Sequence, residues 1–95
     1  MSVRFDWDED KARANINKHG VSFEEASTVF SHPLAKVFSD EEHSGEEVRE
    51  IIVGWSVLDR LLLVAFTERG DDVVRIISAR KATRQERRDY EEGND

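Results

Sequence analysis

Two adjacent cations, Arg80 and Lys81, offer the clearest chemistry in this sequence of 95 residues. They follow a run of apolar residues that predicts a strand, so both would lie at a strand end, just before a final helix. The planar guanidinium of an arginine can hold a phosphate group through two hydrogen bonds, and a lysine adds a compact positive charge. The pair therefore indicates a phosphate site, although a solvated basic flank of the last helix is the simpler alternative.

Lys18 and His19 form a second candidate site at the end of a predicted first helix. A histidine titrates near neutral pH, so His19 could act as a general acid or a general base. The alternative is purely structural, because the helix dipole alone favours a cation at a helix C-terminus.

Metal and thiol chemistry have little support in the sequence. There is no cysteine, which excludes disulfides, thiolate zinc sites and thiol nucleophiles. The other histidines, His32 and His43, show no partner spacing, and the acidic residues 40–50 lack the spacing of a calcium-binding loop. We therefore expect neither a bound metal nor a cofactor.

The charges are unevenly distributed along the chain. The formal net charge of −7 at pH 7 counts against a nucleic-acid partner at first sight. However, residues 40–50 carry six acidic side chains and one arginine, whereas residues 73–90 carry six cations and two acids. This distribution fits a basic site balanced by an acidic far side, and it also fits ordinary solvated faces.

Two helices are predicted near the N-terminus. Residues 8–19 begin with acids and end with Lys and His before Gly20, which matches the helix dipole and a left-handed C-terminal cap. Ser22 and Glu25 have the spacing of a capping box, which predicts a second helix that ends before Pro33.

Four extended segments rich in Val, Ile, Leu and Phe predict strands at residues 34–38, 48–55, 61–67 and 73–79. Short connections between the last three predict antiparallel hairpins, since parallel pairing would need long crossovers. The third segment is apolar at nearly every position, which indicates a central strand covered on both faces. Residues 39–47 predict a long, mobile hairpin tip.

Thr83 and Glu86 repeat the capping-box spacing and predict a last helix to about residue 92.

These elements predict a single α+β domain over residues 1–95, with two N-terminal helices, a four-stranded mainly antiparallel sheet and a C-terminal helix. The N-terminal helices would cover one sheet face, and the last helix or a partner protein would cover the other. Charged residues follow closely on the first methionine, and no apolar run approaches the length of a membrane span. We therefore expect no membrane association and a cytoplasmic location.

Four segments stand out as a set: residues 5–8 (FDWD), 18–26 (KHGVSFEEA), 67–70 (TERG) and 75–91 (RIISARKATRQERRDYE). In their order and separations they resemble the BrnT family of bacterial type II toxins. The resemblance covers nearly the whole chain, whereas residues 34–53 are not diagnostic. It implies a RelE-like fold and a toxin that cleaves RNA without a metal, which inhibits translation and growth. It also implies a BrnA-like antitoxin with a ribbon-helix-helix part. The protein would contact DNA only indirectly, through this antitoxin.

Metal-free RNA cleavage needs a base for the 2′-hydroxyl, cations for the charge that develops on the phosphorus oxygens, and an acid for the leaving 5′-oxygen. Under this resemblance the expected catalytic residues are Lys18, His19, Arg80 and Lys81.

Further contacts to RNA are expected from Trp7, Arg69, Arg84 and Tyr90. The rings of Trp7 and Tyr90 could stack on unpaired bases, although Trp7 could equally belong to the core. Arg69 lies beside Gly70 in a tight turn and could contact a phosphate. Antiparallel pairing places that turn at the far end of the last strand from Arg80, so Arg80 is the stronger candidate.

A second interpretation is a non-catalytic interaction module that has kept the toxin fold. Its open sheet face and last helix would hold a protein partner, and its net acidity fits this interpretation better. An antitoxin is the expected partner under both interpretations, and the acidic residues 40–50 could meet its positive segments.

Overall fold

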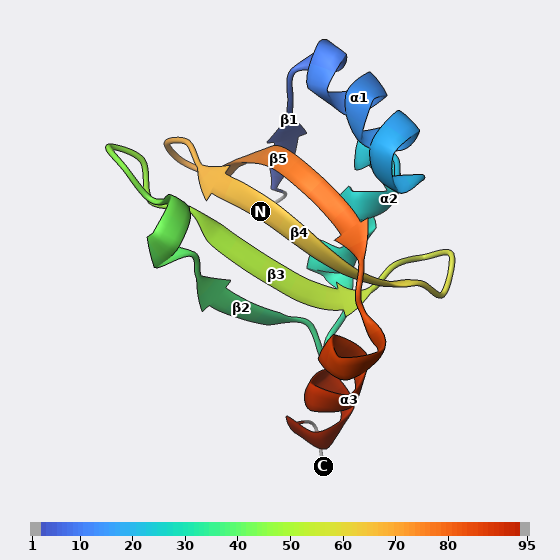
Figure 1. The fold of residues 1–95 in the computed structure, drawn as a ribbon. Coiled ribbons are helices and arrows are strands. Elements are labelled where there is room, and N and C mark those ends of the chain that lie inside the picture. Colours follow the sequence, from blue (N-terminus) through green and yellow to red (C-terminus); the bar gives the residue numbers. More distant parts are fainter. Residues whose placement is uncertain (1–2, 94–95) are drawn as a thin grey trace.

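The computed structural model describes residues 3–93, which form a five-stranded sheet with three α-helices. The elements, including two 3₁₀ turns, are β1 (Arg4–Asp6), α1 (Glu9–His19), α2 (Phe23–Thr28), η1 (Val29–Ser31), β2 (Lys36–Ser39), η2 (Glu41–His43), β3 (Glu50–Trp55), β4 (Leu61–Glu68), β5 (Val73–Lys81) and α3 (Arg84–Gly93). The strand order is β1-β5-β4-β3-β2, with β1 and β2 at the two edges (Figure 1). Within residues 3–93, no helix has the length and apolar character needed to cross a membrane.

The sheet is mixed and has one strand more than the sequence predicted. Strands β2 to β5 pair antiparallel in chain order, as expected, but β1 joins the edge of β5 in parallel, with Arg4 opposite Val73 and Asp6 opposite Arg75. The chain therefore begins with a strand rather than with the first helix. β1 has only three residues, of which only Phe5 is partly buried, so it has no apolar run from which a strand could be predicted.

The capping residues set the limits of the N-terminal helices as predicted. The Asp8 carboxylate accepts a hydrogen bond from a backbone N–H in the first turn of α1, and Gly20 ends this helix with a φ of 68°. The Ser22 hydroxyl caps α2 in the same way. α2 is shorter than expected, because it ends at Thr28 and continues only as the 3₁₀ turn η1.

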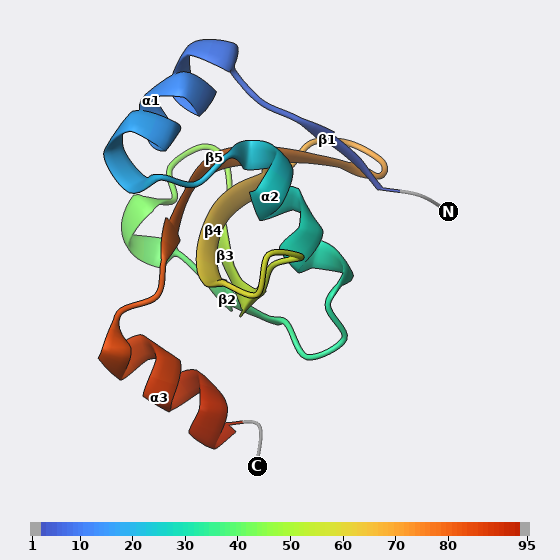
Figure 2. The same ribbon diagram turned by 90° about the vertical axis from the view of Figure 1, so that its right-hand side faces the viewer.

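The main core lies between the sheet and α1, α2 and η1. Its largest fully buried side chains are Phe23, Leu62, Ile76, Val21, Val29 and Val64. Aromatic rings extend this core, with Phe30 making edge-to-face contacts with both Phe5 and Phe66. Figure 2 shows α2 on one side of the sheet and α3 on the other.

The second face of the sheet is covered only at one end. There α3 packs Tyr90 against Val53 and Leu61, and the Arg87 guanidinium lies over the Trp55 ring at 4.9 Å from its centroid. β4 thus has buried side chains on both faces, which confirms the prediction of a central strand. Among residues 3–93, no α-helix lies over the remainder of this face, which holds the candidate site.

A buried asparagine fixes α1 to the edge of β5. The Asn15 amide donates hydrogen bonds to the carbonyls of Val21 (2.9 Å) and Ala79 (2.8 Å), and its oxygen accepts one from the Ala79 N–H (3.1 Å). β1 ends its pairing with β5 at Asp6, so the Asn15 side chain serves as the hydrogen-bonding partner of β5 farther along this edge. These hydrogen bonds hold α1 beside Ala79, the residue that precedes Arg80.

Candidate active site

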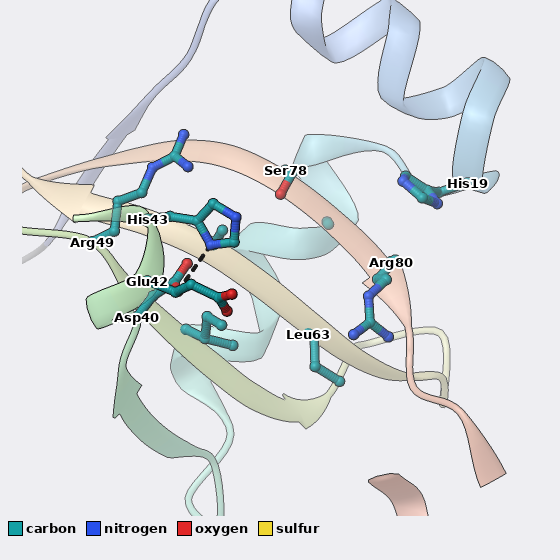
Figure 3. Close-up of a pocket in the computed structure, with 11 residues that line it drawn as sticks. His19, Asp40, Glu42, His43, Arg49, Leu63, Ser78 and Arg80 are labelled. Carbon is teal, nitrogen blue, oxygen red and sulfur yellow. Dashed lines mark hydrogen bonds and ion pairs between the residues drawn. The ribbon is translucent and has the colours of Figure 1, made fainter. Parts of the chain in front are cut away.

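A cavity of about 440 Å³ opens on the sheet face that α3 leaves uncovered. Its floor consists of side chains from β3, β4 and β5, among them Ile51, Leu63, Ala65 and Ser78. Polar and charged groups form its walls: His19 and Arg80 on one side, and Asp40, Glu42, His43 and Arg49 on the other (Figure 3). Residues from α1, from β5 and from the segment between β2 and β3 therefore meet around one hollow.

Arg80 is held at this cavity by a carboxylate from α3. Its two terminal nitrogens donate to the two oxygens of Glu86 at 2.7 and 2.9 Å. Glu86 also accepts a hydrogen bond from the Thr83 backbone N–H, completing the capping box of α3. The Arg80 hydrogen bonds are the main reason that the pKa of Glu86 falls to about 2, and the same contact raises the pKa of Arg80. The guanidinium is thus fixed in place, with much of its charge balanced.

His19 reaches the cavity from the C-terminus of α1, and its neighbour Lys18 does not. His19 is half-buried and lines the cavity close to Arg80 (Figure 3). Lys18 is exposed and is not among the lining residues, because successive side chains of an α-helix point in directions about 100° apart. Of the two candidates at this helix end, only His19 faces the cavity.

Lys81 and Arg84 also lie outside this cavity. Successive side chains of a strand point to opposite faces of the sheet, so Lys81 points away from the face that Arg80 occupies. Arg84 is exposed in the first turn of α3. Both cations stand near the site without lining it.

Arg69 lies at the opposite end of the same sheet face, as the antiparallel pairing predicts. Leu63 pairs with Arg80, whereas Glu68 pairs with Val74 near the β4–β5 turn. Arg69 lines a second cavity of about 410 Å³, which shares His43 and Arg49 with the first cavity. The two cavities therefore adjoin.

Five cations line the two cavities, and we call them the cationic track: Lys11, Arg49, Arg69, Arg75 and Arg80. Three of them pair with acidic residues: Arg69 with Glu47 at 3.1 Å, Arg75 with Asp6 at 3.2 Å and Arg80 with Glu86 at 2.7 Å. The cationic track follows the open sheet face, and the floor of the first cavity there is partly apolar.

The two aromatic candidates serve in packing. Tyr90 is 7% exposed, and its hydroxyl donates a hydrogen bond of 2.6 Å to the Leu34 carbonyl. Trp7 is half-buried against the main core, edge to face with Phe23 at 5.8 Å between ring centroids. Neither ring lines the two cavities, so this structure does not present them for the base stacking that the sequence suggested.

The acidic segment connects the antiparallel strands β2 and β3, as predicted for a long hairpin tip. It contains the 3₁₀ turn η2, and the Ser44 hydroxyl donates to the Asp40 carbonyl (2.8 Å) and accepts from the Arg49 N–H (3.0 Å). These bonds link the two ends of the segment to each other, and the segment forms one wall of the cavity.

This segment supplies site residues that the sequence did not identify, chiefly His43, Asp40 and Arg49. The His43 Nδ1 lies 3.1 Å from the Asp40 Oδ1. The only signal in the sequence is the spacing of three residues between these two side chains, which is common in acidic loops. No group of three or more His, Asp or Glu side chains within residues 3–93 is arranged to hold a metal ion. The cavity can instead bind an anion at Arg80 and exchange protons through histidines on opposite walls.

Known proteins resemble this chain in both sequence and fold. A family model described as the ribonuclease toxin BrnT of type II toxin–antitoxin systems matches residues 7–86. The 1.1 Å crystal structure of the Brucella abortus ribonuclease toxin BrnT superposes with a TM-score of 0.67 and 28% sequence identity, covering 87% of this chain and 100% of that chain. No curated protein sequence gives a comparable match.

The family match extends from Trp7, two residues before α1, into the first turn of α3. It therefore includes every side chain that lines the two cavities, from Lys11 to Arg80. The fold agrees with that of the Brucella protein over the whole length of that chain. This chain belongs to the BrnT family of ribonuclease toxins of type II toxin–antitoxin systems.

Proposed function

We propose that this protein is the toxin of a type II toxin–antitoxin system and that it cleaves RNA internally, without a metal ion, at the cavity beside Arg80. Cleavage of cellular RNA in the cytoplasm would inhibit translation and stop growth. The observation that carries the proposal is the meeting of His19 and Arg80 at one cavity, on a sheet face lined by the cationic track, in a chain of a ribonuclease toxin family.

The geometry supports attack by the 2′-oxygen of the RNA on the adjacent phosphorus. The phosphate would bind at the Arg80 guanidinium, either beside Glu86 or in its place, and the cation would stabilise the charge that develops on the phosphate oxygens. His19 would transfer a proton at the same centre. The products would carry a 2′,3′-cyclic phosphate and a 5′-hydroxyl.

The remaining candidates would act at a distance from the reacting phosphate. Lys18, Lys81 and Arg84 are exposed cations near the cavity, which suits attraction of the RNA backbone. Arg69 would contact a phosphate farther along the strand, in the second cavity. A base stacked on Trp7 or Tyr90 would require the packing of these rings to change.

A BrnA-like antitoxin of the ribbon-helix-helix class is the proposed protein partner. The acidic residues 40–50 border the cavity, so a positively charged antitoxin segment bound there would also obstruct the site. The protein would meet DNA only through this partner. Co-purification of the two chains, and its loss at high salt, would test this part of the proposal.

A non-catalytic interaction module is the second candidate. It is favoured by the bidentate Arg80–Glu86 pair and by Asp40 and Glu42 in the cavity wall, because these carboxylates weaken the attraction of the site for phosphate. Only a test of activity separates the two candidates.

The decisive experiment is expression from a tightly controlled promoter, with and without the neighbouring gene, followed by growth and by the integrity of total RNA. We expect growth arrest with RNA cleavage, both relieved by the neighbour. The purified protein should also cleave single-stranded RNA in the presence of EDTA and leave cyclic phosphate ends. Normal growth with soluble, folded protein and intact RNA would overturn the toxin proposal in favour of the interaction module.

A further inference from the structure

His43 lines the site but has no role in the mechanism proposed above. It lies in η2, on the wall opposite His19 and Arg80, and it lines both cavities (Figure 3). His19 lies on α1 and Arg80 on β5, so His43 brings a titratable group from a different part of the chain to the same hollow.

The Asp40 carboxylate orients the His43 ring. The Asp40 Oδ1 lies 3.1 Å from the His43 Nδ1, and only 12% of the Asp40 side chain is exposed, compared with 60% for His43. The backbone of Asp40 is itself fixed, since its N–H donates to the Arg49 carbonyl at 2.9 Å and its carbonyl accepts from Ser44. A fixed carboxylate thus holds a ring that is open to the cavity.

This contact determines which nitrogen of a neutral His43 carries the proton. A carboxylate accepts hydrogen bonds, so Nδ1 carries the hydrogen and the lone pair is left on Nε2. Nε2 is the atom not engaged by Asp40. A carboxylate that fixes a histidine in this tautomer prepares it to accept a proton from a hydroxyl group.

We propose that His43 is the general base of the RNA cleavage reaction and that Asp40 is its positioning residue. This inference rests on the proposed ribonuclease function and assigns a role that was left open there. His43 Nε2 takes the proton of the 2′-hydroxyl as the 2′-oxygen forms its bond to phosphorus. The bond from phosphorus to the 5′-oxygen breaks, and protonated His19 on the opposite wall gives its proton to that oxygen. Solvent then returns both histidines to their starting states.

His43 has charged neighbours of both signs. The titratable and charged groups that line the two cavities with it are His19, Asp40, Glu42, Arg49, Arg80, Lys11, Glu46, Glu47, Arg69 and Arg75. Asp40 alone among them makes a hydrogen bond to the ring. A reaction that needs one unprotonated base and one protonated acid has a bell-shaped dependence of rate on pH, and the removal of Asp40 should change its rising limb.

The test is cleavage of a single-stranded RNA oligonucleotide by the purified protein in EDTA, with His43→Gln and Asp40→Asn beside wild type. His43→Gln should cleave at least about 100-fold more slowly, because general base catalysis contributes about 10²- to 10⁴-fold. It should lose the rise in rate with pH, yet bind a 2′-O-methyl analogue of the substrate within about twofold of wild type. Asp40→Asn should cleave about 10-fold more slowly or worse, with a displaced pH profile.

His32→Gln is the matched control, because His32 is a partly buried histidine outside both cavities whose Nδ1 accepts the Leu34 N–H. This variant should cleave like wild type.

Added imidazole should restore cleavage to His43→Ala, which separates loss of a base from loss of fold.

Three results would overturn the assignment: His43→Gln cleaving within about threefold of wild type, an unchanged pH profile in that variant, or no rescue of a folded His43→Ala. Wild-type protein that binds the analogue but leaves RNA intact would instead overturn the ribonuclease proposal itself. The two failures are therefore distinguishable.

Discussion

At the scale of single residues, Glu86 has two tasks that are normally separate. It caps α3 by accepting the Thr83 N–H, and it binds both terminal nitrogens of Arg80. The first task places the carboxylate at a fixed point at the start of the helix, and the second uses that point to aim the guanidinium. The arginine is thereby positioned before any ligand arrives, at the expense of part of its positive charge.

Replacement of Arg80 by alanine should remove growth arrest and leave the fold intact. The loss of a cation at the reacting phosphate should slow cleavage about 10²- to 10³-fold. The partly exposed pair with Glu86 stabilises the fold by less than about 1 kcal/mol, so unfolding should change little. Growth after induction and urea unfolding measure the two effects. Arg88→Ala, in the exposed part of α3, is the control, and a stable, still toxic Arg80→Ala protein would contradict the assigned site.

At the scale of elements, the attachment of α1 to β5 depends on Asn15. Asn15→Ala removes three hydrogen bonds and leaves buried carbonyl and N–H groups of Val21 and Ala79 without this partner. We expect the free energy of unfolding to fall by about 3 kcal/mol. Asn17→Ala, on the exposed side of the same helix, should change it by less than about 0.5 kcal/mol. Equal effects of the two substitutions in urea unfolding would count against this role.

The junction of α2 with the β3–β4 hairpin should make stability dependent on pH. Glu25, whose side chain is 4% exposed, accepts hydrogen bonds from Arg60 and from the Ser56 hydroxyl, and the Arg60 contact is the main reason that the pKa of Glu25 lies below its ordinary value of 4.5. A lowered carboxyl pKa means that the folded state binds fewer protons than the unfolded state. This stabilisation is complete above the ordinary pKa and is lost as the pH falls below it.

Glu25→Gln should therefore lower the free energy of unfolding by about 2 kcal/mol at neutral pH, since Arg60 loses a buried charged partner. It should also make the decline in stability below pH 4.5 shallower than in wild type. Urea unfolding at a series of pH values measures both effects. Glu24→Gln, an exposed neighbour on α2, should retain the wild-type profile, and a Glu25→Gln protein with the same pH slope as wild type would contradict the account.

Elements whose signals are local could be predicted from the sequence, whereas contacts between distant segments could not. Capping residues and apolar runs predicted α1, α2, α3 and the strands of the meander. β1 was missed because its three residues owe their conformation to β5, about 70 residues later in the chain. Likewise, motifs at the ends of elements pointed to His19 and Arg80. His43 and Asp40 lie in an irregular segment, and only the tertiary structure brings them to the site.

At the scale of the whole molecule, a net charge of −7 coexists with a face lined by cations. Binding of RNA along the cationic track should weaken as salt rises, because each phosphate contact releases counterions. Arg49→Ala should reduce the slope of log affinity against log salt by about 1. Arg13→Ala, on α1 and outside both cavities, should not change that slope. Affinity measured with a 2′-O-methyl oligonucleotide at several salt concentrations tests this, and a salt-independent affinity would exclude the track as the binding surface.

The pairing of β1 with β5 also has a consequence during synthesis on the ribosome. β1 and α1 are made well before their partner strand β5, because Asp6 and Arg75 are separated by 69 positions. At bacterial elongation rates of about 5–20 residues per second, the N-terminal segment waits several seconds for this partner. His19 and Arg80 belong to segments far apart in the sequence, so a nascent chain carries no assembled site until β5 has been made.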